Sequence, residues 1–285
     1  MNTVSRTGVL GCGLMGSGIA ETAARRGVDV LVVEISPTAV DNGRRRLLAS
    51  LQRGVDRGKL TDSEREQALE RLTFTTELGD LADRELVIEA ATEDPGLKRA
   101  LLRDVDKALG ADAIIASNTS SIPLTDLAGV TGRPDRVIGL HFFNPVPVQP
   151  LVEIVPALTT SADTVDRTRA FAVGQLGKTA IHAPDQAGFV VNGLLVPYLL
   201  AAVRMVQAGT ASAEDIDRGM ELGCAHPMGP LRLLDLIGLD TAEAIARSLH
   251  EEHGEPRYAP PPLLRRMVAA GHLGRKAGRG FYTYT

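Results

Sequence analysis

The segment from Thr7 to Glu34 limits the possible folds more than any other part of the chain. It begins with a short β-branched run, passes through the turn GCGLMG, continues as a helical pattern from Leu14 to Arg26 and ends in a second β-branched run. This order predicts a βαβ unit in which the helix N-terminus stabilises the charge of a pyrophosphate. With 29 glycines in the chain the G-x-G-x-x-G spacing is a weak signal alone, but the strand and helix around it favour a dinucleotide site. The spacing falls on Gly11, Gly13 and Gly16.

Glu34, at the end of the second run, indicates which dinucleotide binds. A carboxylate at this position accepts hydrogen bonds from the adenosine ribose hydroxyls, and its charge opposes a 2′-phosphate. We therefore predict NAD rather than NADP as the cofactor.

Short β-branched runs alternate with helical patterns from Thr7 to about Ala183, which predicts a parallel sheet covered by helices on both faces. Beyond this point the β signal stops, and the remaining segments (188–208, 212–222, 230–249 and 261–270) all have helical patterns. We expect an α/β, Rossmann-type doubly wound sheet in residues 1–185 and a smaller all-α domain in residues 186–285. The predicted strands contain the runs TGVLG, VDVLVVE, LVIEA, AIIAS, RVIGLHF, LVEIV and KTAIHA.

The connection that follows Glu34 is unusually long and charged, from about residue 37 to residue 71. An ordinary crossover between parallel strands is about one helix long. Within the connection, TDSE is a capping box, in which Thr61 and Glu64 satisfy each other's backbone donors. The segment therefore predicts a helical arm made of two helices joined at RGKL.

Composition excludes several classes of protein. The net charge of −4 with interspersed signs argues against a nucleic-acid partner, whose binding surface needs clustered basic residues. The two cysteines, Cys12 and Cys224, support neither a disulfide framework nor a structural zinc site, and we expect no metal. The N-terminus enters a strand almost at once, and the apolar run 188–203 is too short to span a bilayer. We expect a cytoplasmic protein with no membrane partner.

Two strand ends carry residues suited to a proton transfer. His141 ends one predicted strand, Glu153 lies in the next, and a proline-rich loop joins them. Oxidation of an alcohol by hydride transfer needs a base for the hydroxyl proton, and histidine titrates near neutral pH. A carboxylate that holds the imidazole stabilises its charged form. A histidine alone at a strand end is more often structural, so this pair gains weight only from its surroundings.

The loop ASNTSS, which contains Ser120, directly follows the predicted strand AIIAS. Its hydroxyls are therefore expected at the carboxyl edge of the sheet, where ligands bind in such folds.

With these motifs the chain resembles the L-3-hydroxyacyl-CoA dehydrogenases almost from end to end, and within them the short bacterial enzymes of 3-hydroxybutyryl-CoA. The resemblance is carried by GCGLMGSGIAE, VIEAATED, ASNTSS, GLHFFNPVPV, LVEIV, GFVVN, HPMGPLRLLDLIGLDT and LGRKAGRGFYTY. It implies reversible, NAD-dependent oxidation of a (3S)-3-hydroxyacyl-CoA to the 3-oxoacyl-CoA, as part of fatty acid metabolism.

The resemblance also implies roles for residues at matching positions. The catalytic pair falls on His141 and Glu153, the substrate-binding serine on Ser120 and the active-site asparagine on Asn192. The arm is similar to the family's CoA-binding arm, and its cations are Arg53, Arg57 and Lys59, although such a run is about as often a solvated helix face. The implied cofactor contacts are Gly11, Gly13, Leu14, Met15, Gly16, Glu34, Glu93, Lys98 and Asn118.

The second domain is expected to form a homodimer. Its first predicted helix, Phe189 to Val206, is apolar nearly all round and must be covered on every side. A domain of about a hundred residues buries a limited fraction of its surface when it stands alone. The resemblance points to the same assembly.

Four residues depart from the family pattern, and two other functions stay open. The departures affect acyl specificity and the geometry of the arm, and they fall on Gly54, Pro95, Ala187 and Gly193. A same-fold alternative is a dehydrogenase of free hydroxy or sugar acids, similar to gulonate dehydrogenases, and a functional CoA arm discriminates against it. A different class is a catalytically silent NAD-binding protein, against which the complete set of catalytic residues argues.

Overall fold

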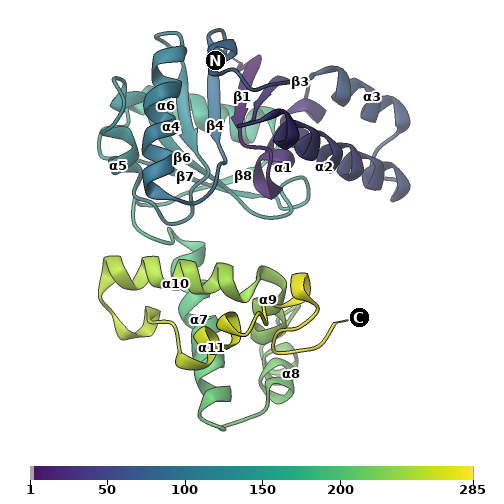
Figure 1. Ribbon diagram of the computed structural model, residues 1–285, viewed down its shortest axis with the longest axis vertical. Coiled ribbons are helices and arrows are strands. Elements are labelled where there is room, and N and C mark those ends of the chain that lie inside the picture. The colour runs from purple at the N-terminus through teal and green to yellow at the C-terminus, as the bar shows by residue number, and fades with distance from the viewer. Residues whose placement is uncertain (1–2, 285) are drawn as a thin grey trace. The chain divides into compact units, whose positions relative to one another are not determined.

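The β-branched runs of the first part of the chain form one sheet of eight strands in the order β3-β2-β1-β4-β5-β6-β7-β8 (Figure 1). The structure is a computed structural model, and it describes residues 3–284. The strands are β1 (Arg6–Leu10), β2 (Asp29–Val33), β3 (Leu72–Thr75), β4 (Leu86–Glu89), β5 (Ile114–Ser117), β6 (Val137–Phe142), β7 (Leu151–Pro156) and β8 (Thr179–His182). The sheet has the predicted Rossmann-type order, with β1 in its interior.

Two details of the sheet differ from the sequence-based expectation. The strands β1 to β6 are parallel, but β7 pairs antiparallel with β6, and β8 runs parallel to β7. The parallel sheet expected from the alternation is confirmed for β1 to β6. The proline-rich β6–β7 connection is a hairpin without a crossover helix, so it returns the chain and sets β7, and with it β8, antiparallel to the other strands. The edge strand β3 was absent from the expected set, because LTFT is short and only partly buried.

The helices of this first part lie between the strands in the chain. They are α1 (Leu14–Arg25), α2 (Pro37–Asp56), α3 (Asp62–Glu70), α4 (Pro95–Ala108), α5 (Leu124–Ala128) and α6 (Ala162–Arg169), and a π-helical turn, Ala170–Gln175, continues α6. Ile19 of α1 and Phe171 of the π-helical turn belong to one buried cluster with Val9 and Val30 of the sheet. This cluster is the core that holds α1, and with it the glycine turn, against the strands.

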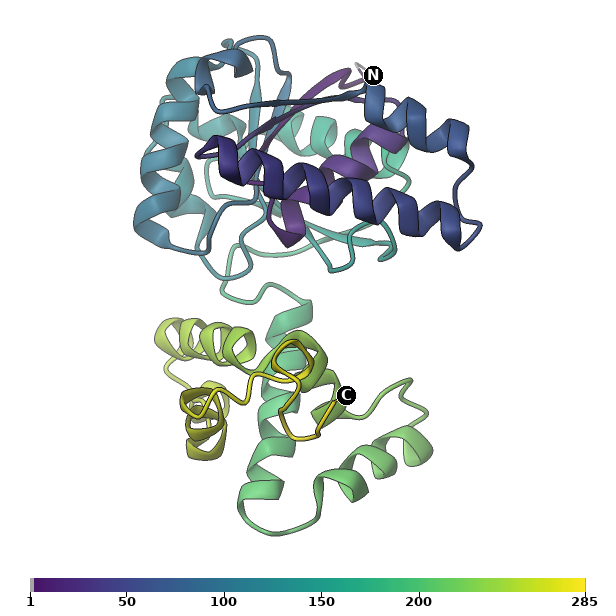
Figure 2. The same cartoon turned by 45° about the vertical axis from the view of Figure 1, so that its right-hand side comes forward.

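The arm consists of two helices, α2 and α3, joined at residues 57–61, as predicted (Figure 2). Thr61 caps α3: its side chain accepts from the Glu64 backbone, and the Glu64 side chain accepts from the Thr61 backbone at 2.8 Å. Leu47 and Leu51 of α2 are buried in the same cluster as α1. The arm is thus packed onto the first part of the chain along one side of α2.

The chain divides into two compact units, Met1–Asp185 and Gln186–Thr285, and the second unit is helical. Its helices are α7 (Val191–Gln207), α8 (Ala213–Gly223), α9 (Pro230–Ile237), α10 (Leu239–His253) and α11 (Pro262–Ala269). The expected single helix over 230–249 is two helices, because Gly238 at their junction has φ +102°. Leu199, Leu234 and Leu249 are fully buried in the centre of this unit. No helix within residues 3–284 combines the length and the apolar character that a membrane span requires.

A buried carboxylate on α8 anchors α9 in the second unit. Asp217 is 2% exposed and accepts from the backbone N–H groups of Leu231 at 2.7 Å and Arg232 at 3.0 Å. It also accepts from the Tyr282 hydroxyl at 2.8 Å. Burial, together with the bond to Asp217, raises the pKa of Tyr282. Asp217 therefore acts as an internal cap of α9 and as an anchor for the C-terminal segment.

A second buried carboxylate, Asp235 on α9, fixes the C-terminal segment. It is 1% exposed and accepts from the backbone N–H groups of Phe281 and Tyr282 at 2.9 Å, and from the Tyr284 hydroxyl at 2.9 Å. A Cβ on Gly280 would overlap the Asp235 carboxylate. The sequence motifs HPMGPLRLLDLIGLDT and GRGFYTY thus contain residues that hold the C-terminal segment against α9.

Candidate active site

His141 and Glu153 face each other across the β6–β7 hairpin. They are direct register partners of the antiparallel pair, and His141 Nδ1 lies 2.7 Å from Glu153 Oε2. Glu153 is fully buried and His141 is 6% exposed. The Phe143 ring packs edge-on against the imidazole at 4.7 Å between centroids. Because Nδ1 is engaged by the carboxylate, Nε2 is the nitrogen suited to accept a proton from a substrate.

A buried lysine, Lys178, binds the loop between the two strands, residues 143–150. The loop contains a cis Asn144-Pro145 peptide. The Lys178 ammonium is 7% exposed and donates to the carbonyl oxygens of Val146 and Gln149, the latter at 2.7 Å. Lys178 thereby fixes the loop that connects the strands of His141 and Glu153.

The loop after β5 lies beside the end of β6. Asn118 Oδ1 accepts from the backbone N–H of Phe142 at 2.9 Å, which ties this loop to the residue after His141. β5 and β6 are parallel neighbours, so their carboxyl ends meet at one edge of the sheet. The structure therefore brings the Ser120 loop and His141 to the same edge, as the sequence predicts.

Glu93 organises the Ser120 loop. Its Oε1 accepts from Thr119 Oγ1 at 2.6 Å, from the Ser120 backbone N–H at 2.9 Å and from Ser121 Oγ at 3.1 Å. Burial acts to raise the pKa of Glu93, but the Lys98 charge and these hydrogen bonds outweigh it and lower the pKa. Glu93 is thus ionised at neutral pH and orients the serine-rich loop.

Lys98 belongs to a buried ion-pair network with Glu89 and Glu93. Its ammonium is 2.6 Å from Glu89 Oε1 and 3.2 Å from Glu93 Oε2, and it donates to the Ala91 carbonyl at 3.3 Å. Lys98 is 1% exposed, and the second Glu89 oxygen accepts from Ser117 Oγ at 2.6 Å. The contacts of Lys98 are with protein oxygens, and its contact with the cofactor stays a prediction. Glu89 was missed by the sequence analysis, although a lone acid inside the apolar strand LVIEA is a signal for a paired buried charge.

The glycine turn has the shape that a dinucleotide requires. Gly11 has φ +84°, a conformation that favours glycine. A Cβ on Gly16 would lie against the Gly11 carbonyl, so α1 can approach the turn closely only because Gly16 has no side chain. A Cβ on Gly13 would meet no protein atom within 4 Å. Protein packing therefore does not explain Gly13, whereas the approach of a cofactor to the backbone does.

A cavity of about 570 Å³ lies beside this turn. Gly11, Gly13 and Glu34 line it together with apolar residues such as Leu78 and Leu97. Glu34 accepts from the backbone N–H groups of Cys12 and Ile35, so its carboxylate is fixed at the mouth of the turn. A largely apolar cleft with the Glu34 carboxylate beside the glycine turn fits adenosine. Leu14 and Met15, in the first turn of α1, directly follow the glycine turn in the chain.

The other predicted site residues lie farther along the chain. Asn192 is in the first turn of α7, in the second unit, and is partly exposed. Arg53, Arg57 and Lys59 are exposed in the arm, at the end of α2 and in the connection to α3. Lys59 also lines a pocket of the first unit, together with Arg25, Arg26 and Lys178.

Three of the four departures from the family pattern have local physical reasons. A Cβ on Gly54 would lie 2.8 Å from the Leu60 side chain, so Gly54 makes room for Leu60 in the arm. Pro95 is in the first turn of α4, where a backbone N–H has no partner within the helix, so a proline there costs no hydrogen bond. The Asp94 side chain caps α4 by accepting from the Leu97 N–H at 2.7 Å. Ala187 donates its N–H to Glu252 at 2.9 Å, a bond that proline cannot make. Gly193 has room for a side chain, and its departure has no structural reason here.

Comparison with known sequences identifies both units. The family described as 3-hydroxyacyl-CoA dehydrogenase, NAD binding domain, matches residues 6–186, and the C-terminal domain of the same family matches residues 188–284. A 3-hydroxybutyryl-CoA dehydrogenase from Mycobacterium tuberculosis is 55% identical over 284 residues, which cover 99% of this chain and 99% of the relative. The human mitochondrial hydroxyacyl-coenzyme A dehydrogenase is 40% identical over 288 residues, which cover 99% of this chain and 91% of the relative.

Solved structures agree with these relatives. FadB2 of M. tuberculosis has a TM-score of 0.99 at 55% identity, with 100% of both chains covered. The (S)-3-hydroxybutyryl-CoA dehydrogenase PaaH1 of Ralstonia eutropha has a TM-score of 0.94 at 47% identity, with 99% of this chain and 100% of that chain covered. Because family, relatives and structures all match over both units, the chain belongs to the NAD-dependent 3-hydroxyacyl-CoA dehydrogenase family.

Proposed function

We propose that the protein catalyses the reversible oxidation of (3S)-3-hydroxybutyryl-CoA to acetoacetyl-CoA, with His141 as the general base and Glu153 as its partner. The observation that carries the proposal is the buried 2.7 Å contact between the imidazole and the carboxylate at the sheet edge where the Ser120 loop also lies. The relatives named as 3-hydroxybutyryl-CoA dehydrogenases support the short acyl chain.

In this proposal the protein's residues accept the substrate's proton, stabilise the charge that forms and orient the substrate. Bound NAD supplies the acceptor for the hydride that leaves C3 of the substrate. His141 Nε2 takes the hydroxyl proton as the C3–O bond becomes a carbonyl, and the Glu153 carboxylate stabilises the imidazolium that forms. Ser120, held by Glu93, orients the substrate oxygen. Asn192 is proposed to orient the thioester carbonyl.

The residues around the glycine turn are proposed to hold the cofactor. Glu34 binds the adenosine ribose, the first turn of α1 faces the pyrophosphate, and Asn118 and Glu93 lie toward the nicotinamide end. The first unit, residues 1–185, is then the cofactor domain with the arm 37–71 for CoA, and the second unit, residues 186–285, serves substrate binding and dimerisation.

One assay separates this function from its alternatives. NADH oxidation is measured with acetoacetyl-CoA and with free acetoacetate at matched concentrations. Turnover of the CoA thioester with little or no turnover of the free acid is the expected result. Faster turnover of the free acid would indicate a dehydrogenase of free hydroxy acids, and no turnover of either would indicate a silent NAD-binding protein.

We also propose that the second unit forms a homodimer. α7 buries Leu199 and Leu200 inside the unit but leaves Leu194 74% exposed. Leu222 of α8 is 75% exposed and Leu236 of α9 is 50% exposed. Large apolar side chains exposed in this number are typical of an interface. Light scattering at micromolar concentration tests the proposal, and a fully active species with the mass of one chain would contradict it.

The cytoplasm is the proposed location. Both cysteines are free thiols, and Cys224 is exposed, which suits a reducing compartment.

A further inference from the structure

An arginine of the arm reaches the glycine turn. Arg46 lies on α2, and its guanidinium donates a hydrogen bond to the Cys12 carbonyl at 2.6 Å. Cys12 stands between Gly11 and Gly13 in the turn, 34 residues before Arg46 in the chain. A hydrogen bond from a charged donor is roughly twice as strong as one between neutral groups. The arm is therefore tied to the backbone of the turn by a strong bond.

Gly43, one helical turn before Arg46, allows α2 to come this close. A Cβ on Gly43 would lie 2.5 Å from the Cys12 Cβ, so a side chain there would push α2 away from the turn. Residues three apart lie on the same side of a helix. The side of α2 that carries Gly43 and Arg46 thus rests directly on Cys12.

Two side chains of opposite charge hold the two peptide units of the turn. The Cys12 N–H, which belongs to the Gly11–Cys12 peptide, donates to the Glu34 carboxylate. The Cys12 carbonyl, which belongs to the Cys12–Gly13 peptide, accepts from Arg46. The N–H and the C=O of a trans peptide point in opposite directions. The bond to Arg46 therefore directs the Gly13 N–H away from the guanidinium.

The Gly13 N–H is the group of this peptide that remains for a ligand. Within residues 3–284 it donates to no protein acceptor, and a Cβ on Gly13 would meet no protein atom within 4 Å. Gly13 lines the cavity of about 570 Å³ beside the turn and directly precedes α1, whose N-terminus stabilises negative charge. A backbone donor in this position fits a phosphate oxygen.

We propose that Arg46 is a positioning residue for the cofactor, which holds the Cys12–Gly13 peptide so that the Gly13 N–H faces the pyrophosphate. The inference rests on the proposed function, in which the glycine turn binds NAD. It adds a residue that lies outside the G-x-G-x-x-G spacing and outside the acid at the end of β2. Because Arg46 belongs to α2, the arm takes part in holding the cofactor site in shape.

Arg45, the neighbour of Arg46 on α2, is a matched control for charge and helix formation. It is exposed, and its guanidinium donates to the Asn42 side chain at 2.6 Å and to the Asp41 carbonyl at 3.4 Å. Both partners belong to α2 itself. Loss of Arg45 therefore removes the same charge from the same helix without touching the glycine turn.

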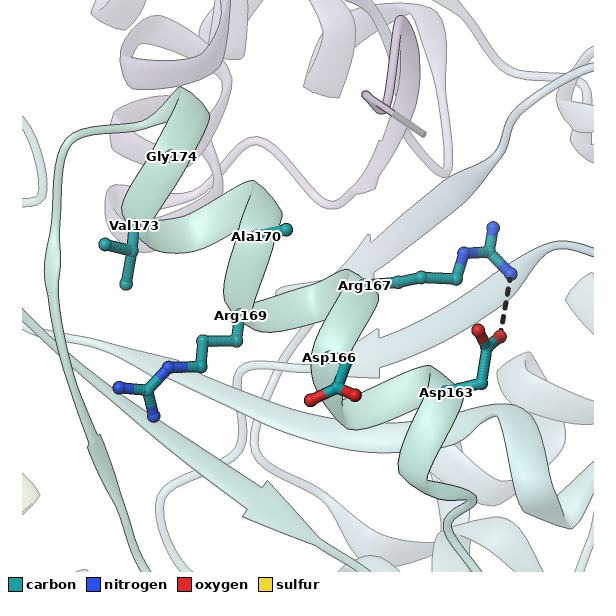
Figure 3. A pocket seen from close by; sticks show the side chains of 7 residues that line it. All are labelled: Asp163, Asp166, Arg167, Arg169, Ala170, Val173 and Gly174. Atoms are coloured by element: carbon teal, nitrogen blue, oxygen red, sulfur yellow. Dashed lines mark ion pairs between the residues drawn. The ribbon is translucent and has the colours of Figure 1, made fainter. Parts of the chain in front are cut away.

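Arg167 of α6 is a second control, for the loss of a bond between a helix and a distant carbonyl (Figure 3). It donates to the Asp112 carbonyl at 3.3 Å and lies 3.7 Å from Asp163. Arg167 lines a hollow of about 580 Å³ on α6 and its π-helical turn, and it is not among the residues that line the cavity beside the glycine turn. Its loss should therefore resemble that of Arg46 in stability and not in cofactor binding.

The test measures binding without turnover. NADH binding is followed by its fluorescence, and ADP-ribose and adenosine compete with it, the first with the pyrophosphate and the second without it. In Arg46→Met we expect the affinity for ADP-ribose to fall by about three- to ten-fold, because the Gly13 N–H is no longer held toward the phosphate. The affinity for adenosine should stay that of the wild type, since the cavity and Glu34 are unchanged. Arg46→Lys keeps a charged donor and should recover most of the loss, and Arg45→Met and Arg167→Met should change neither affinity.

Two outcomes would overturn the proposal. Equal affinities of Arg46→Met and wild type for ADP-ribose would show that the bond to Cys12 does not orient the turn. Equal losses for ADP-ribose and adenosine would show that Arg46 supports the fold of the arm and not the pyrophosphate site. A cofactor site elsewhere is distinguishable, because Glu34→Gln would then leave the affinity for ADP-ribose unchanged as well. Failure of the proposed reaction would appear as a lack of acetoacetyl-CoA turnover by the wild type, on which these binding measurements do not depend.

Discussion

The two units of the chain both bury carboxylates, and they use them in opposite ways. In the first unit Glu153 is paired with the His141 imidazole, which we propose exchanges a proton with the substrate. In the second unit Asp235 accepts from two backbone N–H groups and a phenol, none of which titrates near neutral pH. The first carboxylate is proposed to support chemistry, and the second fixes the chain. Burial of an acid is therefore no sign of catalysis until its partner is known.

The same contrast, between a proposed catalytic role and a structural role, applies to the sequence motifs that resemble the family. GLHFFNPVPV and ASNTSS place their polar residues at the sheet edge, around His141 and Ser120. HPMGPLRLLDLIGLDT and GRGFYTY place Asp235 and its donors inside the second unit. Sequence motifs that all resemble one family thus have different physical reasons.

The largest expected effect comes from removing the proposed base of the first unit. His141→Gln should lower kcat by about a hundred-fold or more, because the positioned base is lost. NAD affinity and the free energy of unfolding should stay close to those of the wild type, since the base acts on the substrate alone. Steady-state kinetics measures kcat, calorimetric titration measures NAD affinity, and urea unfolding measures the free energy of unfolding. Wild-type turnover in this variant would show that His141 is not the base.

Asp235→Asn tests the structural role of the buried carboxylate in the second unit. An amide NH₂ would face donors where the carboxylate accepts, and we expect a loss of about 3 kcal/mol in the free energy of unfolding. Urea unfolding followed by circular dichroism measures it. As a control, Asp163→Asn changes a carboxylate whose side chain is 71% exposed, and it should cost less than about 0.5 kcal/mol. Equal stability of the two variants would remove the structural role of Asp235.

Glu34 sharpens the comparison, because its carboxylate binds the backbone and is also proposed to bind the cofactor. It accepts from the Cys12 and Ile35 N–H groups, and its charge should repel a 2′-phosphate. We expect NADP to bind at least about ten-fold more weakly than NAD. Glu34→Gln keeps an oxygen for Cys12 and should reduce this difference. Similar affinities of the wild type for the two cofactors, measured by titration, would refute the assignment.

The smallest effect concerns the two thiols, one in each unit. Burial, and then the charge of Glu34, raises the pKa of Cys12 to about 12, and the side chain is 1% exposed. At pH 8 Cys12 is therefore protonated and covered, whereas Cys224 is exposed. Ellman's reagent should leave Cys12 unmodified in the native protein, and denaturation should release it. Two fast-reacting thiols in the native state would show that the glycine turn opens readily.

Much of the first unit followed from local patterns. The glycine turn, the capping box of the arm and the His141–Glu153 hairpin each lie within about 35 residues of sequence, where strand and helix periods are direct signals. The return of β7 at the proline-rich loop belongs to these local signals, whereas the direction of β8 does not, since strand direction depends on how a connection closes and not on strand composition. β3 was missed because a half-buried edge strand of four residues has no distinct period.

The parts that could not be predicted depend on distant partners. Asp217 and Tyr282 are 65 residues apart, and Asp235 and Tyr284 are 49 apart, so no local pattern indicates these bonds. The split of the expected helix 230–249 depends on a positive φ at Gly238, a residue that a helix also tolerates at modest cost. Likewise, Arg26, Lys59 and Lys178 meet in one pocket from three separate elements.

The hairpin that joins β6 and β7 also determines which changes the catalytic pair can survive. His141 and Glu153 are opposite each other in an antiparallel ladder, so they are set by strand pairing and not by the length of the loop. Residues could be added to the loop without separating the pair, as long as the ladder keeps its register. A slip of one residue would instead turn Glu153 to the other face of the sheet. The pairing of base and carboxylate is therefore all-or-none, and no intermediate alignment exists from which it could be tuned gradually.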